Sequence, residues 1–206
     1  MPDFRVKLWN ESNSPLDNKY ATVAYRQKLW SRLSNYVRYH ALYTEGGIYL
    51  DTDVEVLNSL TPLLHHRAFG GFQLQEENVD WVGCAVLGAQ PGHNFSRRVL
   101  DLIVKQFEDD GEFCRGPAAT TAVLREMRLC RYGLQEIGDV TLYPREYFYP
   151  YSWLEKFSPE CVKEETLCVH HWMGSGLTPE PRRFPSPRRI AARLMRFTSR
   201  AGALFA

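Results

Sequence analysis

The sequence predicts a single α/β domain, because short apolar segments alternate with helical patterns along most of its 206 residues. Hydrophobic residues make up 44% of the chain and the net charge is +1, so the composition is globular and creates no field that attracts nucleic acid. The five cysteines are widely spaced and form no C-x-x-C pair, which favours reduced thiols over disulfides or a zinc site. We therefore expect helices around a largely parallel sheet.

The individual elements follow from hydrophobic periodicity and from turn residues. Residues 4–9 alternate and predict a strand, which the turn-rich residues 10–15 separate from two helices. The first helix contains Tyr20 and Val23, and the second runs from Leu33 to a natural stop at Gly46-Gly47. Further on, the pattern predicts strands at residues 48–50, 68–74, 81–87, 140–143 and 167–172, and helices at 93–108 and 117–128.

Two acidic residues follow the strand predicted at residues 48–50. Asp51 and Asp53 are separated by a single residue, Thr52. Strand alternation therefore points both carboxylates to the same side and Thr52 away from them. Ligands of α/β sheets bind beyond the carboxyl ends of strands, where two neighbouring carboxylates can share a divalent cation. A D-x-D pair alone is more often two solvated acids in a turn, so the surrounding sequence decides between the two interpretations.

The surrounding sequence carries a longer motif. The segment 34–56, SNYVRYHALYTEGGIYLDTDVEV, closely resembles the DXD sugar-binding region of glycosyltransferase family 32, and the similarity continues at residues 115–117, 137–144 and 169–175. The resemblance implies a GT-A-like fold, the Rossmann-like fold of nucleotide-diphospho-sugar transferases, over residues 1–177. It also implies transfer of a hexose from a nucleotide-sugar donor to a saccharide or lipid-linked saccharide, with retention of configuration. Relatives act in capsule and lipopolysaccharide synthesis, so surface polysaccharide synthesis is the expected process.

The same resemblance assigns roles to single residues. Asp53, His171 and Asp51 are the expected ligands of Mn²⁺ or Mg²⁺; carboxylate oxygens suit both ions, and an imidazole favours Mn²⁺. Arg38 joins Asp51 and Asp53 as an expected catalytic residue, whereas His170 is expected to be an ordinary strand residue. The expected donor-binding residues are Ser34, Asn35, Arg38, Tyr49, Asp51 and Ser175.

The sequence departs from the family pattern at three places. Asn35 stands where the family has Asp, Gly176 stands where relatives commonly have Trp, and the family's first strand and helix are not seen, which makes the expected domain N-terminally short. One alternative is therefore an impaired remnant that binds metal and nucleotide-sugar without transferring sugar. A second is a phosphohydrolase of the haloacid dehalogenase type, which also places D-x-D after a strand but has Thr or Val where Glu55 stands.

Residues 178–206 form a separate, basic tail. This tail holds seven arginines and one acid, and Arg189, Arg193, Arg196 and Arg200 lie on one side of an amphipathic helix predicted at residues 188–201. Such a helix either lies on an anionic membrane or packs on its own domain. No segment has the length of a membrane span or the pattern of a signal peptide, so we expect a cytoplasmic protein, held at the inner membrane face in the first case.

Overall fold

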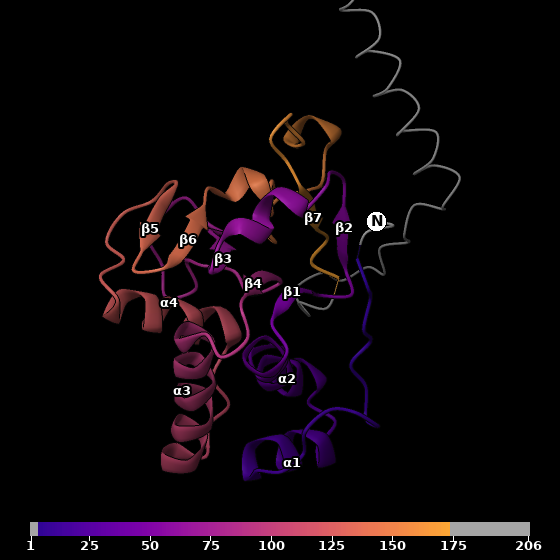
Figure 1. The fold of residues 1–206 in the computed structure, drawn as a ribbon, viewed down its shortest axis with the longest axis vertical. Helices are drawn as coiled ribbons and strands as arrows, with labels where there is room; N and C mark the ends of the chain where they lie inside the picture. Colours follow the sequence, from indigo (N-terminus) through magenta and orange to yellow (C-terminus); the bar gives the residue numbers. More distant parts are fainter. Residues whose placement is uncertain (1–3, 174–206) are drawn as a thin grey trace, which may run out of the picture. The chain divides into compact units, whose positions relative to one another are not determined.

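Two sheets and four α-helices make up residues 4–173, the part of the chain that the computed structural model describes (Figure 1). The strands are β1 (Gly47–Leu50), β2 (Val54–Val56), β3 (Ala68–Gly71), β4 (Val86–Ala89), β5 (Gln135–Ile137), β6 (Val140–Tyr143) and β7 (Cys168–His170). The larger sheet has the order β1-β4-β3-β6-β5, and the smaller sheet pairs β2 with β7. The expected α/β class is confirmed.

The helices lie where the sequence pattern predicts them. They are α1 (Lys19–Arg26), α2 (Trp30–Thr44), α3 (Asn94–Asp110) and α4 (Gly116–Glu126). The Asn18 side chain caps α1 by accepting a hydrogen bond from the Ala21 N–H, at 2.9 Å. After α2, Gly46 takes a left-handed conformation, with φ of 69°, which stops the helix and turns the chain into β1.

Alternate residues of the larger sheet pack into two different cores. In β1 and β4, Tyr49 and Leu87 pack with the helices, whereas Ile48 and Val86 pack into a second core on the other face. That second core also holds Val169 of the smaller sheet. The larger sheet is thus covered on both faces, and the turn from β1 to β2 lies where the two cores meet.

The sheet is not largely parallel, which corrects the expectation from the sequence. Only β3 and β6 pair in parallel among the described strands; β1–β4, β3–β4 and β5–β6 are antiparallel. The segment that joins β3 to β4 contains no helix, so the chain returns beside the strand it has just left instead of crossing over. Apolar segments alternating with helices indicate the fold class but not the direction of each strand.

The strand expected at residues 4–9 is also absent. The segment has no strand assigned, and Val6 and Leu8 remain 87% and 69% exposed. An ion pair from Lys7 to Glu45 and a ring contact from Trp9 to His40 attach the segment to α2 and the residue after it. Alternation yields a strand only where a neighbouring strand offers hydrogen bonds, and no strand among residues 4–173 pairs with this segment.

Three further expectations concern the bounds of the strands, the presence of membrane-spanning helices and the basic tail at residues 178–206. The strands predicted at residues 68–74 and 167–172 are shorter than expected, and the strand predicted at residues 81–87 is shifted to residues 86–89. Within residues 4–173, no helix combines the length and the apolar character that a membrane span requires. The amphipathic helix predicted at residues 188–201 lies outside the described residues, as does the proposed boundary at residue 177.

Candidate active site

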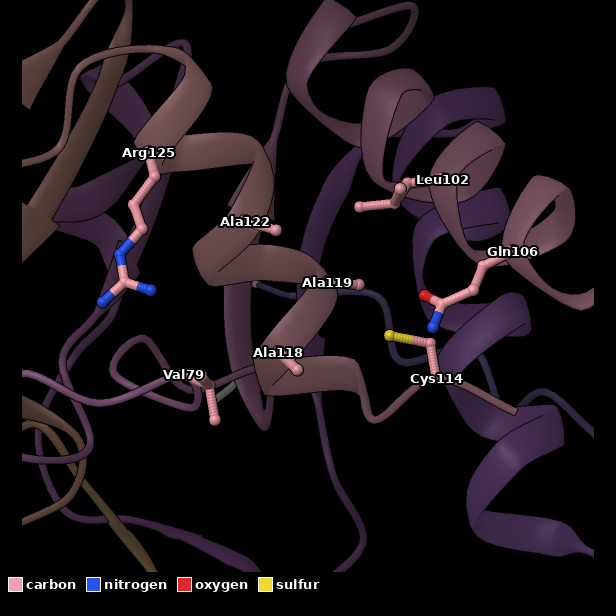
Figure 2. A pocket seen from close by; sticks show the side chains of 8 residues that line it. All are labelled: Val79, Leu102, Gln106, Cys114, Ala118, Ala119, Ala122 and Arg125. Carbon is pink, nitrogen blue, oxygen red and sulfur yellow. The ribbon is translucent and has the colours of Figure 1, made fainter. Parts of the chain in front are cut away.

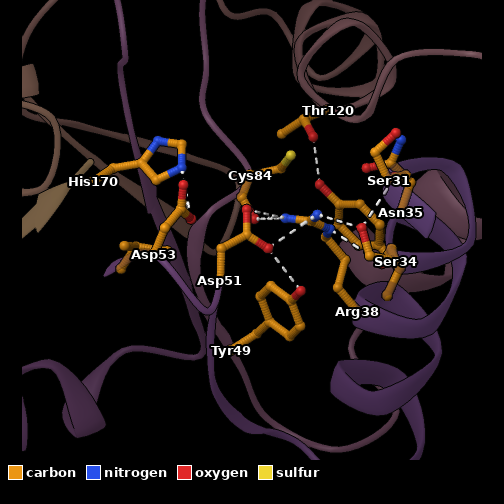
Figure 3. A network of polar contacts seen from close by, with 12 residues as sticks. Ser31, Ser34, Asn35, Arg38, Tyr49, Asp51, Asp53, Cys84, Thr120 and His170 are labelled. Carbon is orange, nitrogen blue, oxygen red and sulfur yellow. Dashed lines mark hydrogen bonds and ion pairs between the residues drawn. The ribbon is translucent and has the colours of Figure 1, made fainter. Parts of the chain in front are cut away.

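The two acidic residues of the D-x-D pair lie in the turn that joins β1 to β2. The Asp51 N–H donates to the Ala85 carbonyl at 2.9 Å, and the Val54 N–H donates to the Asp51 carbonyl at 3.1 Å, which closes the turn. The turn, and not strand alternation, brings the carboxylates of Asp51 and Asp53 together. Because β2 pairs with β7, the end of β7 lies beside the same turn (Figure 3).

Asp51, Asp53 and His170 form a group that can hold a metal ion. Each offers one ligand atom, and these atoms all lie within 4.8 Å of one another. The His170 Nε2 lies 3.2 Å from Asp53 Oδ1, while His170 Nδ1 is buried and has no hydrogen-bond partner among the described residues. Two carboxylates and one imidazole are a donor set that suits Mn²⁺.

The environment of Asp53 keeps its carboxylate charged. Burial raises the pKa of Asp53, but the contact with His170 and the hydrogen bond from the Met173 N–H, at 2.8 Å, outweigh burial and lower the pKa to about 2. An anionic Asp53 is the form that binds a cation, so this residue needs no proton release at neutral pH to act as a ligand.

His171, the histidine expected to bind the metal, lies outside this group. Its Nε2 is 2.9 Å from Glu55 Oε2, its Nδ1 is 3.5 Å from the Tyr151 hydroxyl, and only its backbone N–H reaches Asp53, at the carbonyl. The chain leaves regular strand geometry on both sides, at the turn before β2 and at Trp172, whose φ is 55°. His170 rather than His171 therefore lies beside the two carboxylates, whereas the family resemblance assigns the metal to His171.

Arg38 is buried beneath Asp51, with a side chain only 4% exposed. Its Nη2 lies 3.2 Å from Asp51 Oδ1, and its Nη1 donates to Asp51 Oδ2 at 3.4 Å and to the Cys84 carbonyl (Figure 3). Burial lowers the pKa of Arg38, but the Asp51 carboxylate together with Cys84, Tyr49 and Tyr39 more than reverses this effect and raises the pKa well above its ordinary value. Arg38 was expected to contact the donor; in the structure its partners are protein groups, and it orients Asp51.

Tyr49 and Ser34 complete this network. The Tyr49 hydroxyl donates to Asp51 Oδ1 at 2.7 Å, and its ring lies 4.7 Å from the Arg38 guanidinium. Burial raises the pKa of Tyr49, so the hydroxyl keeps its proton and remains a donor. Ser34 Oγ accepts from Arg38 Nη2 at 3.2 Å. The structure therefore brings Ser34, Arg38 and Tyr49 together around Asp51, whereas Ser175 lies outside the described residues.

Asn35 is buried and faces the start of α4 instead of the carboxylates. Its Nδ2 lies 3.5 Å from the Cys114 carbonyl, and its Oδ1 lies against Gly116. A Cβ added at Gly116 would lie 2.5 Å from Asn35 Oδ1 and 2.7 Å from Cys84 Sγ. The absence of a side chain at Gly116 thus lets α4 begin directly against the helix that carries Arg38.

Gly116→Ala is expected to destabilise the protein by about 1–3 kcal/mol, because the new methyl group overpacks a buried contact. Urea unfolding followed by circular dichroism measures this change. Ala118→Ser, in the first turn of the same helix at a less buried position, is the matched control and should unfold as the wild type does. Equal stability of Gly116→Ala and wild type would show that Asn35 and Cys84 have room to move.

A separate hollow lies between α3 and α4. Its volume is about 280 Å³, and Figure 2 shows the side chains that line it: Val79, Leu102, Gln106, Cys114, Ala118, Ala119, Ala122 and Arg125. None of the expected site residues is among them. The chemistry-bearing groups are gathered at the β1–β2 turn and not in this hollow.

Comparisons with known proteins find two glycosyltransferase regions in this chain. Residues 1–70 match the family model of the glycosyltransferase sugar-binding region containing the DXD motif, and residues 88–175 match that of the alpha 1,4-glycosyltransferase conserved region. The first match contains Asp51 and Asp53, and the second contains His170. The two sheet-terminal segments that build the candidate site therefore each belong to a glycosyltransferase region.

The chain has a mixed α/β fold that is consistent with a GT-A-like architecture, and both of its matched regions are glycosyltransferase regions. Together with the relative below, these matches support the resemblance to glycosyltransferase family 32 that the sequence predicts. It is similar to inositol phosphoceramide mannosyltransferase 3 of Schizosaccharomyces pombe, with 30% identity over 104 residues. That alignment covers 48% of this chain and 28% of the relative.

Proposed function

We propose that this chain performs metal-dependent transfer of a hexose from a nucleotide-sugar donor to a saccharide or glycolipid acceptor, with retention of configuration. The observation that carries the proposal is the group of Asp51, Asp53 and His170, whose ligand atoms lie within 4.8 Å of one another. The matches to two glycosyltransferase regions support glycosyl transfer as the reaction class.

In this proposal, Asp53 and His170 hold the ion directly, and Asp51 completes the group. A bound divalent ion supplies positive charge to the diphosphate, the group on which negative charge develops as the glycosidic bond breaks. We place His170 in the role first expected of His171, since His171 pairs with Glu55. The imidazole makes Mn²⁺ the preferred ion over Mg²⁺.

The remaining site residues act through Asp51. Arg38 and Tyr49 both bind its carboxylate, so its orientation is fixed before any ligand arrives. Such preorganisation lowers the reorganisation that a charged transition state would otherwise require. Arg38 is on this basis a positioning residue, and Asp51 is the side chain that meets the donor or its ion.

The identities of donor and acceptor are the least constrained part of the proposal. The matched relative is named as a mannosyltransferase of inositol phosphoceramide, so we propose mannose as the first sugar to test and a lipid-linked polyol as the first acceptor class. An acceptor of this kind lies at a membrane surface. The basic helix predicted at residues 188–201 would hold the protein there, which remains a prediction from charge pattern alone.

The test is calorimetric binding of GDP-mannose, UDP-glucose and UDP-galactose with Mn²⁺ and with EDTA. We expect at least one donor to bind with Mn²⁺ and to lose that binding when EDTA removes the ion, since a carboxylate group alone repels a diphosphate. Absence of binding by every donor with Mn²⁺ present would contradict the proposal. Hydrolysis of p-nitrophenyl phosphate would favour a phosphohydrolase, and donor binding without turnover would favour the impaired remnant.

A further inference from the structure

An ion pair crosses the smaller sheet beside the candidate metal group. Glu55 lies on β2 and His171 directly follows β7, the two strands that pair in this sheet (Figure 1). Glu55 Oε2 lies 2.9 Å from His171 Nε2, and the two side chains are only 18% and 14% exposed. The proposed function uses neither side chain, so the role of this largely buried pair is open.

The register of the two strands explains why these side chains meet. Glu55 lies opposite Val169, and His171 follows Val169 by two residues, so Glu55 and His171 are diagonal neighbours on one face of the sheet. The His171 N–H donates to the Asp53 carbonyl at 2.9 Å and extends the pairing beyond β7. Because adjacent side chains of an extended chain point to opposite faces, His170 then points away from Glu55, and its Nε2 lies 3.2 Å from Asp53 Oδ1.

The contacts of the His171 imidazole keep both of its nitrogens away from a metal ion. A carboxylate only accepts hydrogen bonds, so the Nε2 that faces Glu55 carries the proton and has no lone pair to offer an ion. The other nitrogen, Nδ1, lies 3.5 Å from the Tyr151 hydroxyl. The Phe157 ring packs against the imidazole, with centroids 5.7 Å apart at an interplanar angle of 65°. The imidazole is thus held by protein groups on several sides.

We propose that Glu55 is a positioning residue of the metal site, an inference that rests on the proposed function. Glu55 binds His171 on one face of the smaller sheet and thereby keeps the His170 imidazole beside Asp53, as the nitrogen ligand of the ion. Without Glu55, the end of β7 can rotate, and two adjacent imidazoles compete for the place beside the carboxylates. Groups that orient the ligands of a metal ion contribute about 10- to 100-fold to its affinity.

Binding of Mn²⁺ alone to the full chain, followed by electron paramagnetic resonance of the free ion, tests this role without any donor. Glu55→Ala is expected to weaken Mn²⁺ binding by about tenfold. Glu55→Gln should bind Mn²⁺ as the wild type does, because its amide oxygen still accepts from His171 Nε2. The matched control is Glu136→Ala, which removes an exposed glutamate from the middle of β5 and should leave Mn²⁺ binding unchanged.

Two further measurements separate positioning from a loss of stability. Circular dichroism melts set a temperature at which every variant is folded, and a variant that is only less stable binds Mn²⁺ normally at that temperature. The double variant Glu55→Ala with His171→Ala should bind Mn²⁺ no more weakly than the weaker of its two single variants, because each change removes the same pair. Additive losses would mean that Glu55 and His171 act separately and would overturn the proposal.

Equal Mn²⁺ binding by Glu55→Ala and wild type, or no Mn²⁺ binding by the wild type, would also overturn the positioning role. Weak binding by Glu55→Gln would overturn it too, because the charge of Glu55 and not its hydrogen bond would then support the ion. A wild type that binds Mn²⁺ but no nucleotide-sugar contradicts the proposed function instead, and the comparison of the variants still decides the role of Glu55. Should Glu55→Ala not fold, Glu55→Val suits a strand and accepts no hydrogen bond, and the same outcomes apply.

Discussion

Asp53→Ala is expected to abolish Mn²⁺-dependent binding of the nucleotide-sugar and to lower turnover by at least about 10²- to 10³-fold. Asp53 contributes a carboxylate that is already charged, with a pKa of about 2, and it is the residue that contacts His170. Removing it leaves a single carboxylate and an imidazole, which cannot neutralise a diphosphate-bound ion as well. Calorimetry with Mn²⁺ and the donor that binds wild type, followed by a transfer assay, measures both effects.

The control for this variant is Asp101→Ala, which removes an exposed carboxylate paired with Arg97 on α3. It should bind metal and donor as the wild type does. Circular dichroism melts confirm that both variants fold. Retention of metal-dependent donor binding by Asp53→Ala would place the ion elsewhere and refute the site.

Arg38→Met is expected to lower the free energy of unfolding by about 3 kcal/mol, because the Asp51 carboxylate and the Cys84 carbonyl lose their buried hydrogen-bond donor. We expect the lower end of the usual range for a broken buried pair, since the Asp51 side chain is still 24% exposed and water can solvate it. Donor affinity should fall as well, because Asp51 loses its fixed orientation. Urea unfolding and calorimetry on the same preparation separate the two effects.

The double variant Arg38→Met with Asp51→Asn distinguishes a lost ion pair from a lost packing contact. If the unpaired carboxylate causes the destabilisation, the double variant should be more stable than Arg38→Met alone, yet it should still bind donor poorly. Full donor affinity in Arg38→Met would mean that Asp51 needs no positioning. Equal instability of the single and double variants would assign the cost to the packing of Arg38 against Tyr49.

The sequence predicts which residues lie in the site better than it predicts which groups those residues contact. Helical spacing predicts Ser34, Asn35 and Arg38 on one face; Ser34 and Arg38 do hydrogen-bond at 3.2 Å, but Asn35 faces the start of α4. Spacing within a helix carries no information on Asp51, which reaches Arg38 from the β1–β2 turn. The convergence of Asp51 and Asp53 was predicted from alternation, but it arises from a turn, because regular strand geometry ends at Leu50.

The same limit explains what the sequence misses in the fold. The helices are local structures, so their spacing and caps identify them. Strand direction and strand partners depend on distant segments. Alternation at residues 4–9 therefore predicts a strand, but no described strand pairs with it, and the direction of β4 beside β3 is not encoded in its own residues. His170 and His171 differ in role for a similar reason, since the pairing of β2 with β7 and the backbone at Trp172 decide which one meets Asp53.

The pairing of β2 with β7 also affects how the protein folds and how stable the folded state is. Asp53 belongs to the early part of the described chain and His170 to its last strand, so an ion held by both residues acts as a clasp that closes most of the domain into one loop. Such an ion binds the native state in preference to the unfolded chain, and it therefore adds stability as its concentration rises. Resistance to proteolysis would then rise with metal concentration. A chain still being synthesised, whose β7 has not yet left the ribosome, could not bind the ion through both residues.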